Sequence, residues 1–181
     1  RSQNWQGAPA FVSIGGTVSG LTGTLVLQNN TKDDLSISAD GNFAFKLFIA
    51  NGKAYDVKVF RQPNGQKCTV NNHQGTATAD VSSVAVVCAS NVTIGGTVSG
   101  LTGTVVLQNN AGNSLATATN GPFTFTESIA PGASYDVTVQ TQPAGQTCFV
   151  TSAFGTASAN VTNVAVACAA ALLITTSAFA A

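Results

Sequence analysis

The sequence contains an internal duplication that runs without a gap. "IGGTVSGLTGTLVLQNN" begins at Ile14, and "IGGTVSGLTGTVVLQNN" begins at Ile94, which is an offset of 80 residues. The only two tyrosines, Tyr55 and Tyr135, keep the same offset. A strict period of this length predicts two copies of one small domain rather than a solenoid of short repeats.

The duplication also sets the expected domain boundaries. A length of 181 residues is enough for two small domains. We expect an N-terminal arm over residues 1–10, a first domain over 11–89, a second domain over 91–169, and an extra C-terminal strand over 170–181.

Apolar and polar residues alternate within each copy, which is the period of a β-strand and not of a helix. Turn signals such as "SGLTG", "ADGN" and "QPNGQ" separate the alternating runs. The first copy is therefore predicted to form a seven-stranded Greek-key β-sandwich, with strands over 11–18, 24–29, 34–39, 42–49, 54–61, 66–71 and 81–88.

The predicted strand over 42–49 has a consequence that can be checked. Alternation in "NFAFKLFI" places Phe43, Phe45, Leu47 and Ile49 on one inward face. In the second copy Glu127 replaces Leu47 at this nominally inward position, either at the end of the sandwich or at an interface.

Each copy contains two cysteines, 20 residues apart. Four cysteines allow three disulfide connectivities. The duplication favours one bridge in each copy, Cys68–Cys88 and Cys148–Cys168, and four buried free thiols are the alternative. Disulfides of this kind indicate an oxidising compartment, outside the cytoplasm.

Two stretches resemble known families. "ADGNFAFKLFIANGKAYDVKV" resembles the signature of transthyretin-like sandwiches, a group that includes carboxypeptidase regulatory-like and Cna-B-type domains. "IGGTVSGLTGTVVLQNN", together with "QPAGQTC" and "NVTNVAVAC", is similar to a tandem repeat of bacterial secreted and cell-surface proteins. The resemblance implies an all-β protein made of two tandem Ig-like or transthyretin-like sandwiches. Cna-B-type domains often carry an internal Lys–Asn isopeptide bond, which the second copy cannot form because it has no lysine.

No residue pattern indicates an enzyme, a cofactor or a metal centre. His73 lies in a predicted hairpin loop, and the second copy has Ala153 in its place. A calcium site would need six to eight oxygen ligands, and the second copy does not keep the acidic character of Asp33, Asp34 and Asp40. These residues are interpreted as ordinary loop and turn residues.

Composition excludes several classes of partner. Charged residues make up 8% of the chain and the formal net charge is zero, so no basic surface for nucleic acid is predicted. The longest apolar run, 164–174, is about half of the roughly 20 residues that a membrane-spanning helix needs. Because the sequence starts at Arg1 and contains no methionine, we expect either a processed mature form or a fragment of a secreted protein, from which any signal peptide has been removed.

The segment after the last cysteine, "AAALLITTSAFAA", aligns with the first strand of each repeat. Leu172 and Ile174 lie 80 residues after Val92 and Ile94. The segment lacks the glycines of "IGGTVSGL", which indicates a true end rather than the start of a third repeat. The residues predicted to form a strand between subunits are Leu172, Leu173, Ile174, Thr175 and Phe179.

A free apolar strand is an aggregation hazard unless a neighbour's sheet edge pairs with it. The sequence therefore predicts a structural extracellular subunit that assembles head to tail with copies of itself into a fibre. The alternative is a stalk or binding module of a larger multi-repeat bacterial adhesin, whose glycan or host-cell partner the sequence does not identify. Trp5, in the N-terminal arm, either packs on its own domain or anchors a contact with a neighbour.

Overall fold

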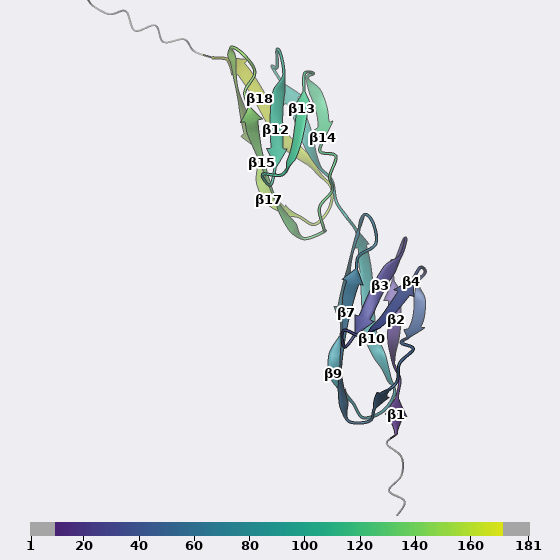
Figure 1. Ribbon diagram of the computed structural model, residues 1–181. Coiled ribbons are helices and arrows are strands. Elements are labelled where there is room, and N and C mark those ends of the chain that lie inside the picture. The colour runs from purple at the N-terminus through teal and green to yellow at the C-terminus, as the bar shows by residue number, and fades with distance from the viewer. Residues whose placement is uncertain (1–9, 172–181) are drawn as a thin grey trace, which may run out of the picture. The chain divides into compact units, whose positions relative to one another are not determined.

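The computed structural model describes residues 10–171, which form two compact units that divide between Ser90 and Asn91 (Figure 1). We call the unit before this boundary domain 1 and the unit after it domain 2. Trp5 and the predicted tail residues Leu172, Leu173, Ile174, Thr175 and Phe179 lie outside the described residues. The described part is all-β, and none of it forms a helix that could cross a membrane.

Domain 1 contains ten strands, two of them only two residues long. They are β1 (Phe11–Val12), β2 (Ile14–Ser19), β3 (Leu25–Asn29), β4 (Asp33–Ile37), β5 (Gly41–Ala44), β6 (Ile49–Ala50), β7 (Lys53–Arg61), β8 (Gln66–Asn71), β9 (Gln74–Ala77) and β10 (Val81–Ser90). Domain 2 contains eight strands. They are β11 (Ile94–Ser99), β12 (Val105–Asn109), β13 (Asn113–Thr117), β14 (Gly121–Thr124), β15 (Ala133–Thr141), β16 (Gln146–Thr151), β17 (Phe154–Ala157) and β18 (Val161–Ala170).

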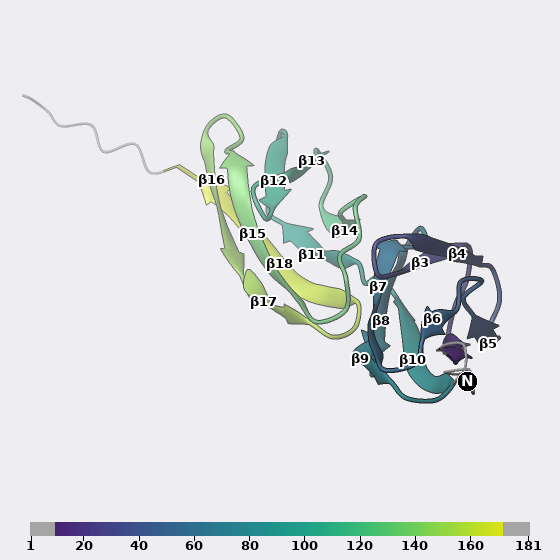
Figure 2. The same ribbon diagram turned by 60° about the horizontal axis from the view of Figure 1, so that its bottom comes forward.

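Each domain is built from two four-stranded sheets. In domain 1 the orders are β5-β2-β10-β8 and β4-β3-β7-β9, and in domain 2 they are β14-β11-β18-β16 and β13-β12-β15-β17. The first and last long strands, β2 and β10, run parallel, as do β11 and β18, while the other pairs within these sheets are antiparallel. A separate two-stranded sheet, β1-β6, lies where the chain enters domain 1 (Figure 2).

The core of each domain lies between its two sheets. Alternate residues of each strand point inward and form it. Most buried positions of one domain are also buried in the other at the offset of 80 residues. The fully buried pairs are Ile14 and Ile94, Leu25 and Val105, Leu27 and Leu107, Val57 and Val137, Val84 and Val164, and Val86 and Val166. Within a strand this packing leaves no room for an insertion, because a one-residue shift would turn every inward side chain outward.

Both disulfides join directly opposite residues of neighbouring antiparallel strands. Cys68 on β8 faces Cys88 on β10, and Cys148 on β16 faces Cys168 on β18. The bridges therefore tie the edge strand of one sheet to the long strand that ends each domain.

The prediction of one strand over 42–49 is wrong. β5 ends at Ala44, and Leu47 is 55% exposed rather than inward. In both domains a side chain at the start of β4 or β13 bonds to the backbone of this position: the Leu47 N–H donates to the Asp33 carboxylate (2.8 Å), and the Asn113 side chain donates to the Glu127 carbonyl (3.2 Å). Glu127, at the matching position of domain 2, is also exposed, so its predicted inward position is wrong as well.

The predicted number of seven strands is also too small. Each domain has an additional edge strand, β9 or β17, immediately after the loop that follows β8 or β16. These strands, "QGTA" and "FGTA", are short and carry only one buried residue each, Ala77 and Ala157. Such a segment has no run of alternating apolar residues by which a strand could be predicted.

Candidate interaction surface

Seven large hydrophobic side chains are exposed among the described residues: Phe11, Leu47, Phe48, Phe60, Val87, Phe149 and Phe154. Three of them belong to the β1–β6 region of domain 1. Phe11, Leu47 and Phe48 are 62%, 55% and 62% exposed. We call these three residues the N-terminal apolar patch.

Strand pairing places part of this patch on one outward face. In the β1-β6 sheet, Phe11 is opposite Ala50 and Val12 is opposite Ile49. Val12 is buried in the core, so the Phe11–Ala50 pair faces outward. Phe48 directly precedes β6 and is exposed like Phe11.

A cavity of about 310 Å³ adjoins the patch. Its lining residues are Asn29, Asn30, Lys32, Asp33, Leu47, Phe48 and Ile49. Asp33 is 7% exposed, and its hydrogen bond to the Leu47 N–H fixes the loop between β5 and β6 against the start of β4. The apolar patch is thus presented by a loop that is tied to the sandwich.

Domain 2 has the same surface without the apolar side chains. Asn91, Glu127 and Ser128 occupy the positions of Phe11, Leu47 and Phe48. The matching cavity, of about 170 Å³, is lined by Asn109, Asn110, Gly112, Asn113, Glu127, Ser128 and Ile129. Because the domain folds with polar residues here, folding does not require the apolar patch of domain 1.

The reverse difference occurs on domain 2. Phe149 on β16 and Phe154 on β17 are 67% and 78% exposed. The matching residues of domain 1 are Thr69 and Gln74. Each domain therefore carries exposed aromatic side chains that its partner repeat replaces with polar ones.

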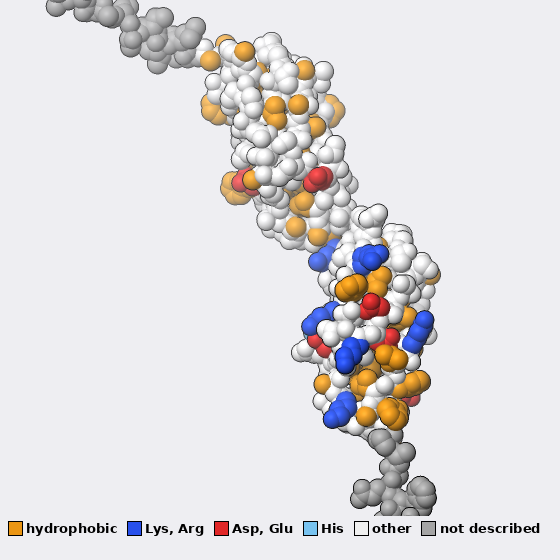
Figure 3. Space-filling model, in the orientation of Figure 1, with side chains coloured by type: hydrophobic (Ala, Val, Ile, Leu, Met, Phe, Trp, Pro, Cys, Tyr) orange, Lys and Arg blue, Asp and Glu red, His pale blue; other side chains and the backbone are white. Residues whose placement is uncertain are grey.

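Charge is distributed just as unevenly between the repeats. Residues 1–90 contain all seven Lys and Arg and five of the seven Asp and Glu, a net charge of +2. Residues 91–181 contain no Lys or Arg and two acidic residues, Glu127 and Asp136, a net charge of −2. On the face drawn in Figure 3, the basic side chains lie on domain 1.

The structure brings His73 into a small polar cluster. The Asp56 carboxylate contacts Lys58 Nζ (2.7 Å) and His73 Nδ1 (3.2 Å). The hydrogen bond from Lys58 is the main cause that lowers the pKa of Asp56, and His73 adds to it. In domain 2 Asp136 has neither partner, since Thr138 and Ala153 replace Lys58 and His73.

Asp33, Asp34 and Asp40, which were considered as calcium ligands, bond to different partners and do not form a common site. Asp33 accepts the Leu47 N–H, Asp34 accepts from the Gln28 side chain, and Asp40 accepts the N–H groups of Gly20 and Leu21. Within residues 10–171, no group of three or more His, Cys, Asp and Glu side chains is placed to hold a metal ion.

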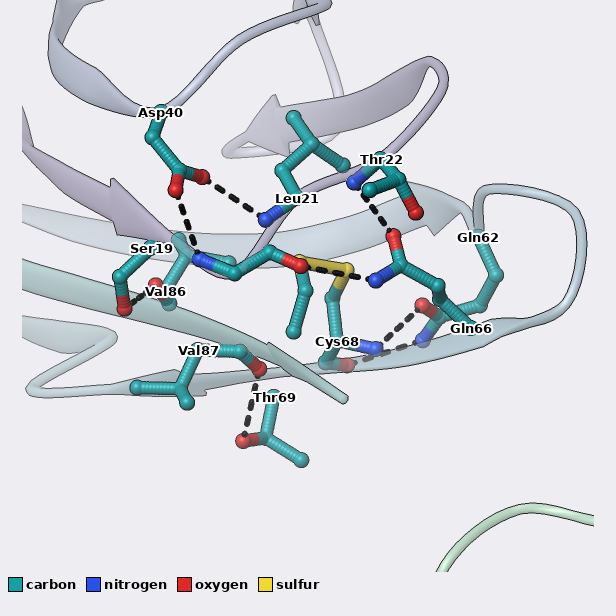
Figure 4. The surroundings of a disulfide bond; sticks show 12 residues. Ser19, Leu21, Thr22, Asp40, Gln62, Gln66, Cys68, Thr69, Val86 and Val87 are labelled. Atoms are coloured by element: carbon teal, nitrogen blue, oxygen red, sulfur yellow. Dashed lines mark hydrogen bonds between the residues drawn. A yellow bond between two sulfur atoms is a disulfide. The ribbon is translucent and has the colours of Figure 1, made fainter. Parts of the chain in front are cut away.

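Sequence reasoning missed the role of two repeated glutamines near each disulfide (Figure 4). The Gln62 side chain accepts the Cys68 N–H and donates to the Cys68 carbonyl. The Gln66 side chain accepts the Thr22 N–H and donates to the Gly20 carbonyl. The recurring spacing in "QPNGQKC" and "QPAGQTC" was the available signal, because both glutamines flank a turn that ends at the cysteine strand.

No known family model matches the sequence, and a search of curated proteins finds no match either. Among solved structures, the chain has a match to the major pilin protein (T-13) from Streptococcus pyogenes serotype GAS131465. The match covers 89% of this chain and 97% of that chain, at 9% sequence identity and a TM-score of 0.28.

Proposed function

We propose that this protein is a structural, non-enzymatic subunit of an extracellular filament. In this proposal the tail over 172–181 of one copy joins the next copy by β-strand addition. The proposal rests on what the tail has in common with the first strand of each repeat and on where it differs.

The common feature is the apolar register. Leu172 and Ile174 lie 80 residues after Val92 and Ile94, and these two residues of domain 2 are 7% and 0% exposed. The tail thus carries the side chains that a first strand buries. Burial of a Leu or Ile side chain contributes about 1.5–3 kcal/mol relative to exposure, which favours a partner for the tail.

The difference that carries the proposal lies in two residues. Thr175 and Thr176 stand where domain 2 has Gly95 and Gly96. A Cβ atom at Gly96 would lie 1.7 Å from the Val164 carbonyl oxygen. One at Gly95 would lie 2.3 Å from the carbonyl oxygen of Phe123, also a backbone atom.

A tail with two threonines therefore does not fit as the first strand of a third domain with this geometry. This steric conflict disfavours the alternative, a stalk in which the tail begins the next repeat. An apolar strand that cannot start its own domain has a use when it adds to the sheet of another copy. Head-to-tail addition without closure produces a filament.

The two disulfides support the extracellular part of the proposal. Each domain buries the modest core expected of about 80 residues, and small domains in oxidising compartments commonly gain stability from disulfides. Both bridges belong to the repeated unit, so both domains are suited to the same compartment.

Sedimentation velocity and negative-stain electron microscopy of the full chain and of a chain ending at Ala171 test the proposal. Truncation there keeps the hydrogen bond from the Ala171 N–H to the Gly145 carbonyl. We expect linear oligomers that grow with concentration for the full chain, and monomers for the truncated chain and for Leu172→Ser/Ile174→Ser. A full chain that stays monomeric, or a truncated chain that assembles equally well, would overturn the proposal.

A further inference from the structure

We infer that the N-terminal apolar patch of domain 1 is the acceptor for the tail of a second copy. This inference rests on the proposed function and adds the surface of the receiving subunit. The occupant is residues 172–181 of the preceding copy, with Leu172, Ile174 and Phe179 as its apolar contacts.

The first reason is that the patch is exposed without being needed for folding. Its three side chains are more than half exposed, and domain 2 replaces all three with polar residues. Exposed aromatic and aliphatic residues gathered beside a cavity are typical of interaction sites. The side chain of Phe48 and the cavity of about 310 Å³ next to it offer a place for an apolar residue of the tail.

The second reason is that the patch belongs to a sheet that can accept a strand. β1 and β6 form a sheet of only two strands, so each of them is an edge strand. An added extended segment gains backbone hydrogen bonds from such an edge and side-chain contacts from the residues that flank it. The tail starts with three consecutive apolar residues, Leu172, Leu173 and Ile174, so an extended segment would present apolar side chains to the patch in either register.

The third reason is the position of the patch along the chain. In domain 2 the corresponding end is joined covalently to the preceding domain through Ser90 and Asn91. In a head-to-tail assembly, the same end of domain 1 is where the preceding copy arrives. The tail begins directly after β18, the last strand of domain 2, and its ten residues span about 33 Å when extended.

The fourth reason is charge. The half of the chain that carries the tail has a net charge of −2, and the half that carries the patch has a net charge of +2. Opposite charges favour contact between domain 2 of one copy and domain 1 of another, and disfavour contact between like domains. The patch itself is uncharged, so it can bury the apolar tail, while the net positive charge of domain 1 as a whole favours the approach of domain 2 of another copy.

Binding of a fluorescently labelled peptide of residues 170–181 to the chain ending at Ala171 tests the acceptor. The variant Leu47→Glu/Phe48→Ser installs the residues of domain 2, which that domain accommodates in the same fold. The control variant Phe149→Thr/Phe154→Gln removes two other exposed aromatics and installs the residues of domain 1. We expect at least a tenfold weaker affinity for the first variant and less than a twofold change for the control.

A second patch variant, Phe11→Asn, controls for a local folding defect in the loop that carries Leu47 and Phe48. It is also expected to weaken binding of the peptide. Equal binding by the parent chain and both patch variants, or no binding by the parent chain, would overturn the inference. Binding that appears only after residues 1–9 are removed would assign the patch to the chain's own arm, and would also overturn it. Tail-dependent assembly of full-length Leu47→Glu/Phe48→Ser would overturn the acceptor and leave the proposed function standing.

Discussion

Single atoms decide which residues the first strand of each repeat can contain. The glycine doublet of "IGG" lets β11 approach β18 and β14 closely, since a Cβ at Gly96 would overlap the Val164 carbonyl oxygen at 1.7 Å. Gly112, in the same domain, has only an ordinary contact at 3.8 Å. The two positions form a matched pair for substitution by alanine.

Gly96→Ala should destabilise domain 2 by about 3 kcal/mol or more, because the obstructing atom belongs to the backbone and the strands must separate. Gly112→Ala should change the free energy of unfolding by less than about 1 kcal/mol and in the stabilising direction, because alanine reduces the entropy of the unfolded chain. Urea denaturation of both variants measures the difference. Equal stability of the two would contradict the role given to the doublet.

A second prediction at this scale concerns acid. The Ser13 N–H donates to the Asp80 carboxylate (2.7 Å), and this hydrogen bond lowers the pKa of Asp80 below its ordinary 3.8. A lowered pKa means that the stabilisation is present above pH 3.8 and is lost as the pH falls through the folded-state value. In domain 2 Asn160 accepts the Thr93 N–H in the same way, without a titrating group.

NMR titration of the Ser13 amide should therefore show an acid transition with a midpoint below pH 3.8. Asp80→Asn, which installs the residue of domain 2, should remove that transition while keeping the fold. A midpoint at or above 3.8 in the parent chain, or an unchanged transition in the variant, would contradict this assignment.

Among the elements, the strand pairs joined by disulfides have the clearest energetic role. β8 and β10 are held at Cys68–Cys88, which closes a loop with a sequence separation of 20. Constraining the unfolded chain in this way contributes about 3 kcal/mol in the chain-entropy model. The Gln62 side chain adds two hydrogen bonds to the backbone of Cys68 that do not depend on the bridge.

Cys68→Ser/Cys88→Ser should therefore lower the free energy of unfolding of domain 1 by about 3 kcal/mol. The strands should still pair, because the register of six residues between β8 and β10 and the Gln62 hydrogen bonds remain. Domain 2, with its own bridge, serves as the internal control. Reading the amide signals of each domain during urea denaturation separates the two, and a loss confined to domain 2 or absent from both would contradict the prediction.

Elements with strong alternation could be predicted from the sequence, and those shaped by side-chain hydrogen bonds could not. β3, β7 and β10 bury the alternate residues that the pattern indicates. The prediction of one strand over 42–49 was wrong because the strand ends at Ala44, and the side chains of Asp33 and Asn113 bond to the backbone of the position at Leu47 and Glu127 in the two domains. Leu47 and Phe48 follow the end of β5 and are exposed, which is why the candidate acceptor was missed as a surface.

At the scale of the whole molecule, the two domains share a core and differ in their surfaces. Six fully buried aliphatic positions are common to both, whereas the exposed aromatics and the charges differ. Duplication alone would produce two domains with the same surface. The differences leave domain 1 basic with the N-terminal apolar patch, and domain 2 acidic and followed by the apolar tail, as a subunit with unlike ends requires.

A cryo-electron microscopy map of filaments formed by the full chain tests the central claim most directly. We predict density for residues 172–181 of each subunit on domain 1 of the next, added to a sheet edge and covering Phe11, Leu47 and Phe48. A map in which the tail folds back on its own subunit, or in which subunits join through other surfaces with the tail free, would contradict the claim.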